Sequence, residues 1–350
     1  MSARGADVPA SRESADAPTS GESTDAHALG GSADVLTFGE SMVALRGDGP
    51  LKLGGSMAVS VAGAESNVAI GLSRLGHGVR WTGAVGDDEA GELVLRTLRA
   101  EGVDVRGAGR DAGAPTGLLL FEPRLPEVTR VHYYRAGSAG SRLGPDAVER
   151  AFAAGPPPRV LHLTGITPAL GPGPRAACER ALRLAREHSV RVCLDVNFRS
   201  RLWSQEEAAA VIRDWIPYVH VLVASDDELP LCLPADGAPG EPADQAGLLL
   251  GLGVREVVVK LGSRGATAYT RGGELHRPAR AVRAVDAVGA GDAFVAGYLS
   301  ALLDGADVAG RLERAVTTGA FAVASRGDWE GAPTRGELGM LGDGDGAVLR

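Results

Sequence analysis

Short apolar runs alternate along this chain with longer stretches in which apolar residues recur every three or four positions. The run Val35–Phe38 is followed by a glycine, as at the end of a buried strand. Further on, Val68, Leu72 and Leu75 fall at positions i, i+4 and i+7, and Gly76 ends that pattern. A short apolar run predicts a buried strand, whereas this spacing predicts an amphipathic helix with a glycine at its C-terminus.

The same alternation continues to the end of the chain. Further strands are predicted at residues 160–163, 191–196, 219–223 and 256–260. Helices are predicted at residues 65–75, 175–187, 205–215, 243–252, 290–303 and 311–324. Strands that alternate with helices favour an α/β fold of three layers, with a mostly parallel sheet covered on both faces. Ligands of such sheets bind beyond the C-terminal ends of the strands.

Two segments interrupt this rhythm, and both chain ends differ from the middle. Residues 43–60 and 114–136 have the pattern of extended chain, and we expect them to form a small sheet, a lid, over one edge of the main domain. Residues 1–33 are rich in Ser, Ala, Asp, Gly and Thr without recurring large apolar residues, which predicts a disordered tail. The main domain is therefore expected at 34–340, followed by a short C-terminal tail at 341–350.

Composition excludes several classes of function. The formal net charge is −8 without a basic stripe, which argues against nucleic acid as a partner. Three widely spaced cysteines, Cys178, Cys193 and Cys232, fit neither a disulfide framework nor a zinc site, so we expect a reducing, cytoplasmic setting. No apolar run reaches the length of about 18 residues that predicts a membrane span. Only two lysines occur, Lys52 and Lys260; arginine supplies the other basic side chains.

The strongest chemical motif precedes the helix predicted at 290–303. Gly289, Ala290 and Gly291 allow the backbone to approach an anion, and a helix N-terminus offers unpaired N–H groups. Asp292 follows in the first turn, where its carboxylate could accept a proton from a hydroxyl directed at phosphorus. The alternative interpretation is a glycine-rich turn whose aspartate only complements the helix dipole.

Other nucleotide and hydrolase motifs are not found. Neither lysine follows a glycine, as a Walker A loop requires, and Phe294 stands where a dinucleotide fingerprint needs its last glycine. The catalytic and metal loops of protein kinases, His-Glu-x-x-His and Gly-x-Ser-x-Gly do not occur either.

Four segments resemble the PfkB family, whose members phosphorylate sugars and nucleosides. Residues 288–294 resemble its C-terminal signature and residues 62–76 its N-terminal signature. Residues 259–266 are similar to its nucleotide-side loop, and residues 225–228 to its Asn/Ser-x-x-Glu motif. The resemblance covers about residues 34–340 and implies a ribokinase-like fold, ATP and Mg²⁺ as cofactors, and a homodimer or higher homo-oligomer through the lid.

The resemblance also implies roles for individual residues. Asp292 would be the general base, and the backbone amides of Gly289, Ala290 and Gly291 would hold charge on the transferred phosphoryl group. Glu228 would act on Mg²⁺ through water, although the segment 225–228 taken alone favours a simple helix N-cap with acids in the first turn. The residues implied near the nucleotide are Asn197, Arg199, Ser225, Lys260, Leu261, Gly262, Ser263, Arg264, Gly265, Ala266 and Val316. Val316 stands where a polar residue is expected, so adenine contacts there are expected to differ.

Three further segments resemble the branch of the family that phosphorylates 2-keto-3-deoxygluconate: residues 133–139, 195–203 and 325–334. The residues implied around the sugar acid are Gly63, Ala64, Glu65, Ser66, Asn67, Leu119, Tyr133, Tyr134, Arg135, Arg199, Asp292 and Asp328. Charge supports this substrate, because planar arginine side chains match a carboxylate, which a neutral sugar lacks.

Alternatives remain open at this stage. Tyr133 and Tyr134 could be cross-strand packing, and Arg135 a solvated edge charge. A regular strand would place Tyr133 and Arg135 on one face and Tyr134 on the other, so contact of all three with one ligand requires a bulge or a ligand across the strand end. Fructose, ribose or the galactonate epimer could be the substrate instead. The chain could also be a sugar-binding regulator, against which an intact Asp292 argues.

Overall fold

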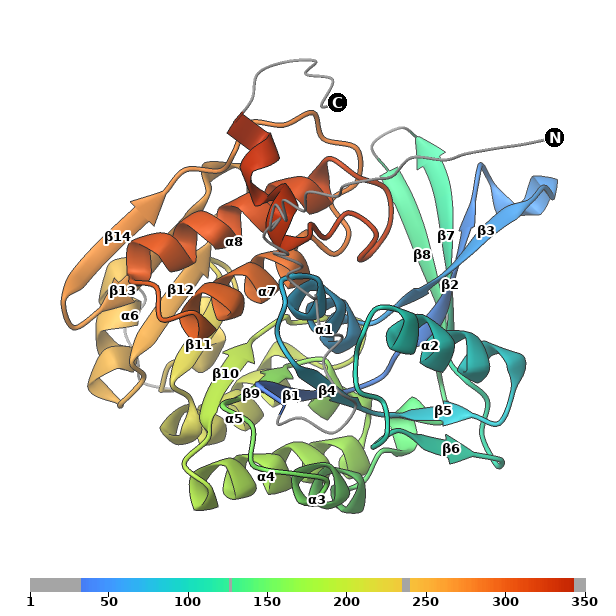
Figure 1. The fold of residues 1–350 in the computed structure, drawn as a ribbon, viewed down its shortest axis with the longest axis horizontal. Coiled ribbons are helices and arrows are strands. Elements are labelled where there is room, and N and C mark those ends of the chain that lie inside the picture. The colour runs from blue at the N-terminus through green and yellow to red at the C-terminus, as the bar shows by residue number, and fades with distance from the viewer. Residues whose placement is uncertain (1–32, 126–127, 235–239, 343–350) are drawn as a thin grey trace, which may run out of the picture.

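A computed structural model describes residues 33–125, 128–234 and 240–342. Its larger sheet has eight strands in the order β14-β13-β12-β11-β10-β9-β1-β4 (Figure 1). The strands from β4 to β12 in this order run parallel, and β13 and β14 form an antiparallel edge. Their bounds are β1 (Val35–Phe38), β4 (Val79–Thr82), β9 (Val160–Thr164), β10 (Arg191–Asp195), β11 (Val221–Ser225), β12 (Glu256–Lys260), β13 (Ala266–Thr270) and β14 (Gly273–Arg277). The prediction of a mostly parallel sheet is confirmed.

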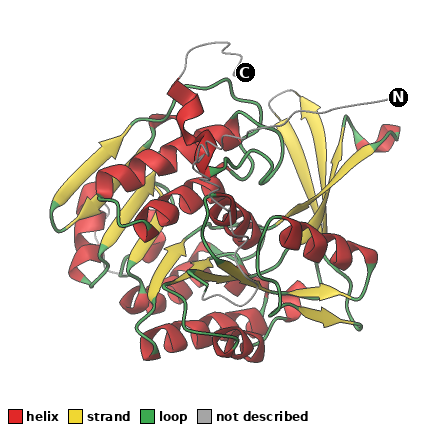
Figure 2. Ribbon diagram, viewed as in Figure 1, coloured by secondary structure: helices red, strands yellow, loops and turns green. Residues whose placement is uncertain are grey.

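Helices cover both faces of this sheet (Figure 2). One layer contains α1 (Ala64–Arg74), α2 (Glu89–Ala100), α7 (Ala290–Leu303) and α8 (Val308–Val323). The other layer contains α3 (Pro145–Ala153), α4 (Pro172–Glu187), α5 (Gln205–Trp215) and α6 (Pro242–Gly251). The shorter 3-10 helices are η1 (Leu51–Leu53), η2 (Gly140–Arg142), η3 (Thr167–Leu170), η4 (Ile216–Tyr218), η5 (Leu229–Cys232), η6 (Gly262–Arg264) and η7 (Arg335–Gly342).

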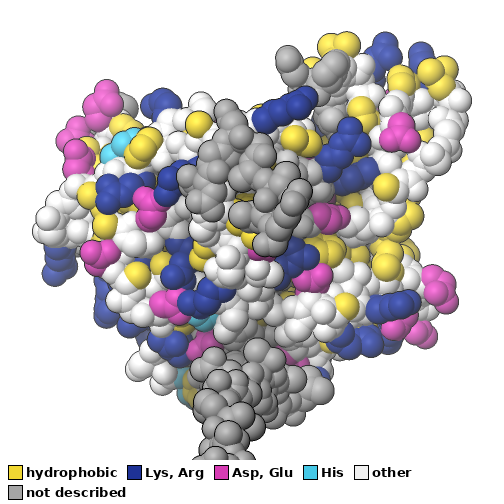
Figure 3. All heavy atoms as spheres, turned by 45° about the horizontal axis from the view of Figure 1, so that its top comes forward, with side chains coloured by type: hydrophobic (Ala, Val, Ile, Leu, Met, Phe, Trp, Pro, Cys, Tyr) yellow, Lys and Arg dark blue, Asp and Glu magenta, His cyan; other side chains and the backbone are white. Residues whose placement is uncertain are grey.

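A second sheet of four strands projects from one side of the main domain, as predicted for residues 43–60 and 114–136 (Figure 1). Its order is β3-β2-β7-β8, with bounds β2 (Met42–Gly47), β3 (Met57–Ala62), β7 (Leu118–Leu125) and β8 (Val128–Tyr134). We call this sheet the lid. Figure 3 shows hydrophobic side chains on its surface. A further short pair, β5 (Ala84–Gly86) and β6 (Gly109–Asp111), forms a separate two-stranded sheet next to α2 (Figure 1).

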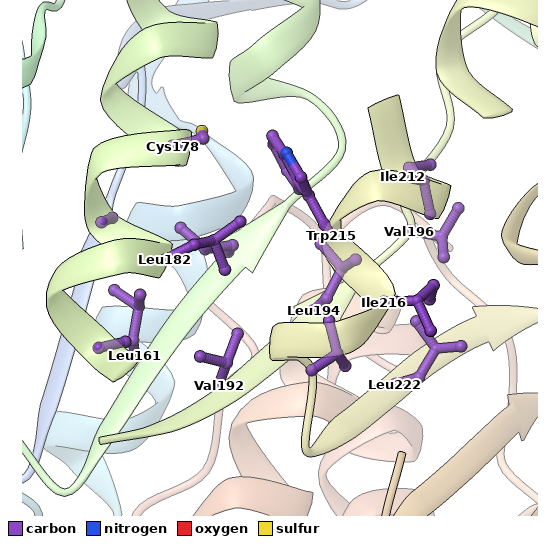
Figure 4. Packing of buried hydrophobic residues seen from close by; sticks show 14 of the residues in the cluster. Leu161, Cys178, Leu182, Val192, Leu194, Val196, Ile212, Trp215, Ile216 and Leu222 are labelled. Carbon is purple, nitrogen blue, oxygen red and sulfur yellow. The ribbon is translucent and has the colours of Figure 1, made fainter. Parts of the chain in front are cut away.

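The core follows from strand alternation, because successive side chains of a strand point to opposite faces. Leu161 of β9 packs with Leu182 of α4 and Trp215 of α5 on one face (Figure 4). Val160, its neighbour in the chain, packs on the opposite face with residues of α1 and α7. Each fully buried leucine or valine side chain contributes about 1.5–3 kcal/mol relative to exposure. The two apolar clusters fix the positions of the polar strand ends between them.

The chain ends lie mostly outside the described residues. The predicted tail at 1–33 includes Ala33, which is described and buried, while residues 1–32 are not described. Of the predicted C-terminal tail at 341–350, Leu341 and Gly342 close η7. Within the described parts of the chain, no helix is both long and apolar enough to cross a bilayer.

Candidate active site

The N-terminus of α7 lies at the C-terminal edge of the large sheet. Gly289 caps this helix with φ of 73°. A Cβ on Gly289 would meet the carbonyl oxygen of Asp328 at 1.8 Å, so both the backbone conformation and the space require glycine. The N–H groups of Gly289 and Gly291 have no hydrogen-bond partner among the described residues. This turn therefore offers unpaired donors at the positive end of a helix, as expected for an anion site.

Asp292 in the first turn of α7 is buried and bound to α1. Its Oδ2 accepts a hydrogen bond of 2.7 Å from Nδ2 of Asn67. Asn67 is itself buried, and its Oδ1 has no partner within the described chain. An unpartnered amide oxygen beside a carboxylate leaves one acceptor free for a donor that the chain does not supply, such as a substrate hydroxyl.

The pKa of Asp292 is raised to about 7. Burial is the largest cause, because it disfavours the charged form; the nearby carboxylate of Asp195 acts in the same direction. The hydrogen bond from Asn67 and the charges of Arg199 and Lys260 oppose this rise. A carboxyl group that titrates near neutrality can both take up and release a proton.

Two cationic side chains lie beside this helix end. Lys260, the last residue of β12, donates a hydrogen bond of 2.7 Å to Asp195 at the end of β10. Arg199 is exposed and has no carboxylate partner among the residues that the structure describes. Asn197, which lies between Asp195 and Arg199 in the chain, has a left-handed backbone conformation with φ of 41°. This rare conformation for a non-glycine residue is typical of functional loops.

Glu228 joins the loop that carries Asn197 and Arg199 to the end of β11. Its carboxylate accepts backbone hydrogen bonds from Phe198 N at 2.7 Å and Ser225 N at 2.9 Å. One acceptor position on each oxygen is therefore already used by the chain. Across residues 33–125, 128–234 and 240–342, no group of three or more His, Cys, Asp or Glu side chains is arranged to hold a metal. A role of Glu228 at Mg²⁺ through water stays a prediction.

The predicted nucleotide loop is the tight turn between β12 and β13. Leu261 N donates to the Gly265 carbonyl at 2.8 Å, and Gly265 has φ of 94° where a Cβ would strike the Arg277 carbonyl. Arg264 pairs with Asp226 at 2.6 Å, which joins this loop to the turn after Ser225. In the same loop, Gly262 and Ser263 are exposed and Leu261 is half-buried, while Ala266 is fully buried in β13.

Val316 contributes differently from the other predicted nucleotide residues. It is 6% exposed on α8 and packs in the apolar cluster with Leu312 and Ala315. A nucleotide that reached this position would find only the small exposed part of an apolar side chain.

The lid brings some of the predicted substrate residues together and separates one. Leu119 of β7 pairs with Tyr133 of β8, whereas Leu118 pairs with Tyr134. The register shift of this hairpin lies at 123–125, so the strand is regular at Tyr133 and Tyr134. Tyr134 therefore lies on the opposite face from Leu119 and Tyr133, and the strand has no bulge at Tyr133 or Tyr134. Contact of Tyr133, Tyr134 and Arg135 with one ligand then requires a ligand that lies across the strand end, and this contact stays a prediction.

The inner face of the lid contacts the loop before α7. Leu119 packs with Met42, Ala44 and Phe121, and Val288 packs against this cluster. Leu119 is thus placed beside the glycine-rich turn, as the prediction of a shared site requires.

Arg135 follows β8 and is paired within the protein. Its Nε donates to Glu40 Oε2 at 2.7 Å, and its guanidinium lies 5.7 Å from the ring of Tyr133. Glu40 is 1% exposed and also accepts a hydrogen bond from Ser138. Arg135 was predicted to be available for a substrate carboxylate; instead, it already neutralises a buried carboxylate, so its remaining N–H donors would have to serve the ligand.

The segment predicted around the substrate at Gly63–Asn67 has mixed roles. Glu65 accepts hydrogen bonds of 2.6 Å from Thr164 and Thr167, and burial raises its pKa. Ser66 donates to the Gly63 carbonyl at 2.9 Å within its own turn. Ala64 starts α1 and is buried. Asn67 is thus the member of this segment that hydrogen-bonds to Asp292.

Sequence reasoning missed Arg46. Its guanidinium, on β2, pairs with Asp286 at 3.2 Å and with Asp328, and stacks 3.8 Å above the ring of Phe121. Burial raises the pKa of Asp328 to about 6, against the charge and hydrogen bond of Arg46. The only available signal was an arginine at the end of the alternating run 42–47. The carboxylate of Asp328, predicted to line the sugar pocket, is thus engaged by the lid.

Two further contacts hold the lid to the segment after α8. Trp329 Nε1 donates to the Val61 carbonyl at 3.0 Å, and Ser60 donates to Glu330. Together with Arg46, they join the lid to the loops on both sides of α7 and α8.

The chain is similar over most of its length to known carbohydrate kinases. The model of the pfkB family carbohydrate kinases matches residues 32–335. The 2-dehydro-3-deoxygluconokinase of Thermoproteus tenax is 37% identical over 85% of this chain and 91% of its own length. That of Bacillus subtilis is 35% identical, over 87% and 93%. The 2-dehydro-3-deoxygalactonokinase of Haloferax volcanii is 34% identical, over 84% and 92%.

Solved structures agree as well. The PfkB protein from Polaromonas sp. JS666 superposes with a TM-score of 0.77 at 34% identity, covering 88% of this chain and 99% of that one. The 2-dehydro-3-deoxygluconokinase of Thermotoga maritima superposes with a TM-score of 0.79 at 26% identity, covering 89% and 98%.

Proposed function

The chain belongs to the pfkB family of carbohydrate kinases, and we propose that it phosphorylates 2-keto-3-deoxygluconate to the 6-phosphate with ATP. The observation that carries this proposal is a buried carboxyl group with a pKa of about 7, on Asp292, at a helix end with unpaired N–H groups. A base of this pKa beside an anion site is suited to deprotonate a hydroxyl as it attacks phosphorus.

Asp292 takes the proton in the proposed reaction. As the oxygen of the sugar hydroxyl bonds to the γ-phosphorus, its proton passes to Asp292, and the bond to ADP breaks with its electron pair. The N–H groups of Gly289 and Gly291 stabilise the charge on the phosphoryl oxygens. Asn67 keeps the carboxylate of Asp292 in place through the bond of 2.7 Å.

Mg²⁺ would arrive on the oxygens of ATP rather than in a protein cage, because the described residues offer no cluster of acidic or histidine ligands. When bound, it neutralises phosphate charge. Water on this ion could reach Glu228, whose two oxygens each keep a free acceptor position besides the backbone bond. The exposed Arg199 has no carboxylate partner in the described parts of the chain and is available to a phosphate or to the substrate carboxylate.

The names of the relatives support a sugar acid as substrate, and the charges near the lid agree with it. Arg199 and the free donors of Arg135 would face the carboxylate of 2-keto-3-deoxygluconate, while Leu119 and Tyr133 would contact its carbon chain. A second candidate is the galactonate epimer, because the Haloferax volcanii relative, of nearly equal similarity, is named for that substrate. The epimers differ only in hydroxyl configuration.

We also propose that two copies assemble through their lids. Large apolar side chains of the lid are exposed: Leu51, Leu53, Val59, Leu125, Val128, Tyr133 and Tyr134 (Figure 3). Exposed apolar side chains of a small open sheet are stabilised when a second copy covers them. Tyr134 and Val59 lie on the face away from the proposed substrate contacts Leu119 and Tyr133, where a second copy can reach them.

One assay tests the proposed activity. ADP release is measured with ATP and each of 2-keto-3-deoxygluconate, its galactonate epimer, fructose and ribose, and the product is identified by phosphorus NMR. We expect the highest kcat/KM with 2-keto-3-deoxygluconate. A preference for a neutral sugar would refute the sugar-acid assignment, and sugar binding without ADP release would indicate a regulator.

A further inference from the structure

Lys260 occupies an unusual position at the C-terminal edge of the large sheet. Its side chain crosses the end of β11 to reach Asp195 on β10, with Nζ 2.7 Å from Oδ1. The Asp195 side chain is 1% exposed, whereas that of Lys260 is 18% exposed. The carboxylate is therefore interior, and the ammonium lies on the outer side of the pair.

The outer side of this pair meets the first turn of α7. A Cβ built on Gly291 would lie 3.8 Å from Lys260 Nζ, and among the described residues no atom outside its chain neighbours and the backbone of its own helix would be within 4 Å. A helix N-terminus carries partial positive charge, so an ammonium group beside it is unfavourable unless an anion compensates. The carboxylate of Asp195 supplies the compensating negative charge on the interior side of Nζ. The space between Nζ and the N–H groups of Gly289 and Gly291 therefore has a positive potential from both the ammonium and the helix end.

Lys260 keeps its charge in this position. Burial alone would lower its pKa, but the carboxylates of Asp195 and Glu228, and the hydrogen bond to Asp195, outweigh burial and raise it. An ammonium group at neutral pH thus faces the same helix end as the carboxyl group of Asp292, which itself contributes to the rise.

The composition of the chain adds an independent observation. Of 36 basic residues, two are lysines, Lys52 and Lys260, so 34 are arginines. Lys52 is exposed on η1 of the lid. An ammonium group is compact and directs three donors tetrahedrally, whereas a guanidinium is planar and longer. An ammonium group that donates to a carboxylate still has two donors for further groups.

We propose that Lys260, held by Asp195, donates a hydrogen bond to a non-bridging oxygen of the phosphoryl group while that group passes from ATP to the sugar hydroxyl. This inference rests on the proposed kinase function. In the step, the bond between the acceptor oxygen and phosphorus forms, and the bond from phosphorus to the β,γ-bridging oxygen breaks. The electron pair leaves with ADP, the hydroxyl proton goes to Asp292, and Lys260 keeps its proton.

Steady-state kinetics of Lys260→Met provides the first test. Loss of one preorganised donor to a transition-state oxyanion typically costs about 10²- to 10³-fold in kcat. We expect a loss of that size, with the affinity for ADP changed less than about threefold because ADP lacks the transferred group. Lys52→Met, at the other lysine of the chain, is the matched control and should keep the wild-type kcat.

The double variant Lys260→Met with Asp195→Asn separates the proposed role from a structural one. Lys260→Met alone leaves Asp195 buried without its cation, which can destabilise the fold. The double variant removes both charges, so we expect it to regain the melting temperature but not kcat. If Lys260→Met does not fold, the double variant carries the test. Recovery of kcat to within about tenfold of wild type would overturn the inference.

Ligand binding gives a readout that does not depend on turnover. Calorimetry compares ADP alone with ADP plus aluminium fluoride, a planar mimic of the phosphoryl group, each with 2-keto-3-deoxygluconate present. The wild type should bind the mimic complex at least about tenfold more tightly than ADP, and Lys260→Met should lose that gain. An active wild type whose Lys260→Met variant keeps both the gain and kcat refutes only the role of Lys260. A wild type that transfers no phosphoryl group overturns the proposed function and this inference together.

Discussion

Replacement of Asp292 by Asn should abolish turnover and stabilise the fold in the same variant. The carboxyl group is buried, and its pKa is raised from 3.8 in the unfolded chain to about 7. A raised pKa of an acid means that folding disfavours its ionised form. Below the unfolded pKa, Asp292 therefore neither raises nor lowers the free energy of unfolding. As pH rises from about 4 towards 7 and above, Asp292 lowers that free energy.

The size of this effect follows from the shift of the pKa. About three pH units at about 1.36 kcal/mol each correspond to an upper value of about 4 kcal/mol at pH 8. Asparagine has nearly the same shape and can still accept the hydrogen bond from Asn67, but it carries no charge to bury. Asp292→Asn should therefore raise the free energy of unfolding by up to about 4 kcal/mol at pH 8 and by less than about 1 kcal/mol near pH 4.

Two measurements test this reasoning. Urea unfolding followed by circular dichroism at pH 4, 6 and 8 gives the stability difference, and coupled ADP release gives turnover, which should fall about 10²- to 10⁴-fold. In the wild type, kcat/KM should rise about tenfold between pH 6 and pH 8 as the base ionises. A variant that is less stable than wild type at pH 8, or that keeps more than a tenth of the turnover, would refute the role and the pKa assigned to Asp292.

Three further perturbations test other parts of the structure. Arg135→Ala should lower kcat/KM for the sugar acid about ten- to a hundredfold, from a lost charged hydrogen bond of roughly 1.5–3 kcal/mol, with a smaller loss for a neutral ketose. Arg135→Ala should also lower the melting temperature, because Glu40 stays buried without its cation, and addition of Glu40→Gln should restore it. Equal losses of kcat/KM on both substrates would show that the role of Arg135 is structural. Arg46→Ala should raise KM for the sugar acid about tenfold while ADP affinity stays constant, since the lid loses its link to Asp286 and Asp328; an unchanged KM would contradict this. Deletion of residues 1–32 should change neither melting temperature nor kcat, and a clear loss of either would show that the segment contributes to the domain.

Elements with strong local signals were predicted to the residue. β12, α5 and α7 begin and end where the pattern places them. Local chemistry explains why: Ser204 and Glu207 form a capping box before α5, and Gly289 precedes α7. The helix predicted from 175 begins instead at Pro172, because a proline at the first position of a helix extends it beyond the apolar pattern. The predictions omitted two helices and five strands: α2, α3, β4, β5, β6, β13 and β14.

The candidate site also contains a local motif that the sequence could predict and long-range pairs that it could not. The helix end at Gly289–Asp292 is a local motif, and sequence reasoning reached it. The pairs Arg46–Asp328 and Arg135–Glu40 join residues 282 and 95 positions apart, and such partners depend on how the lid docks. The positive charge of an arginine suggested that Arg135 binds the carboxylate of the substrate. The sequence could not reveal that Arg135 pairs with the carboxylate of Glu40 within the protein. Tyr134 stays a predicted substrate contact: strand alternation places it on the opposite face from Tyr133, so both can reach one ligand only across the strand end.

The hydrogen bond between Asn67 and Asp292 has a consequence for synthesis of the chain. It joins residues 225 positions apart, on α1 and α7, and these helices approach so closely that a Cβ on Gly71 would meet Ala296 at 2.8 Å. Chains fold from the N-terminus as they leave the ribosome. A nascent chain that has completed β12 already has the strands of its parallel sheet, yet it has neither the proposed base, Asp292, nor the glycine turn. Under the proposed function, phosphoryl transfer would therefore begin only when α7 has emerged and docked.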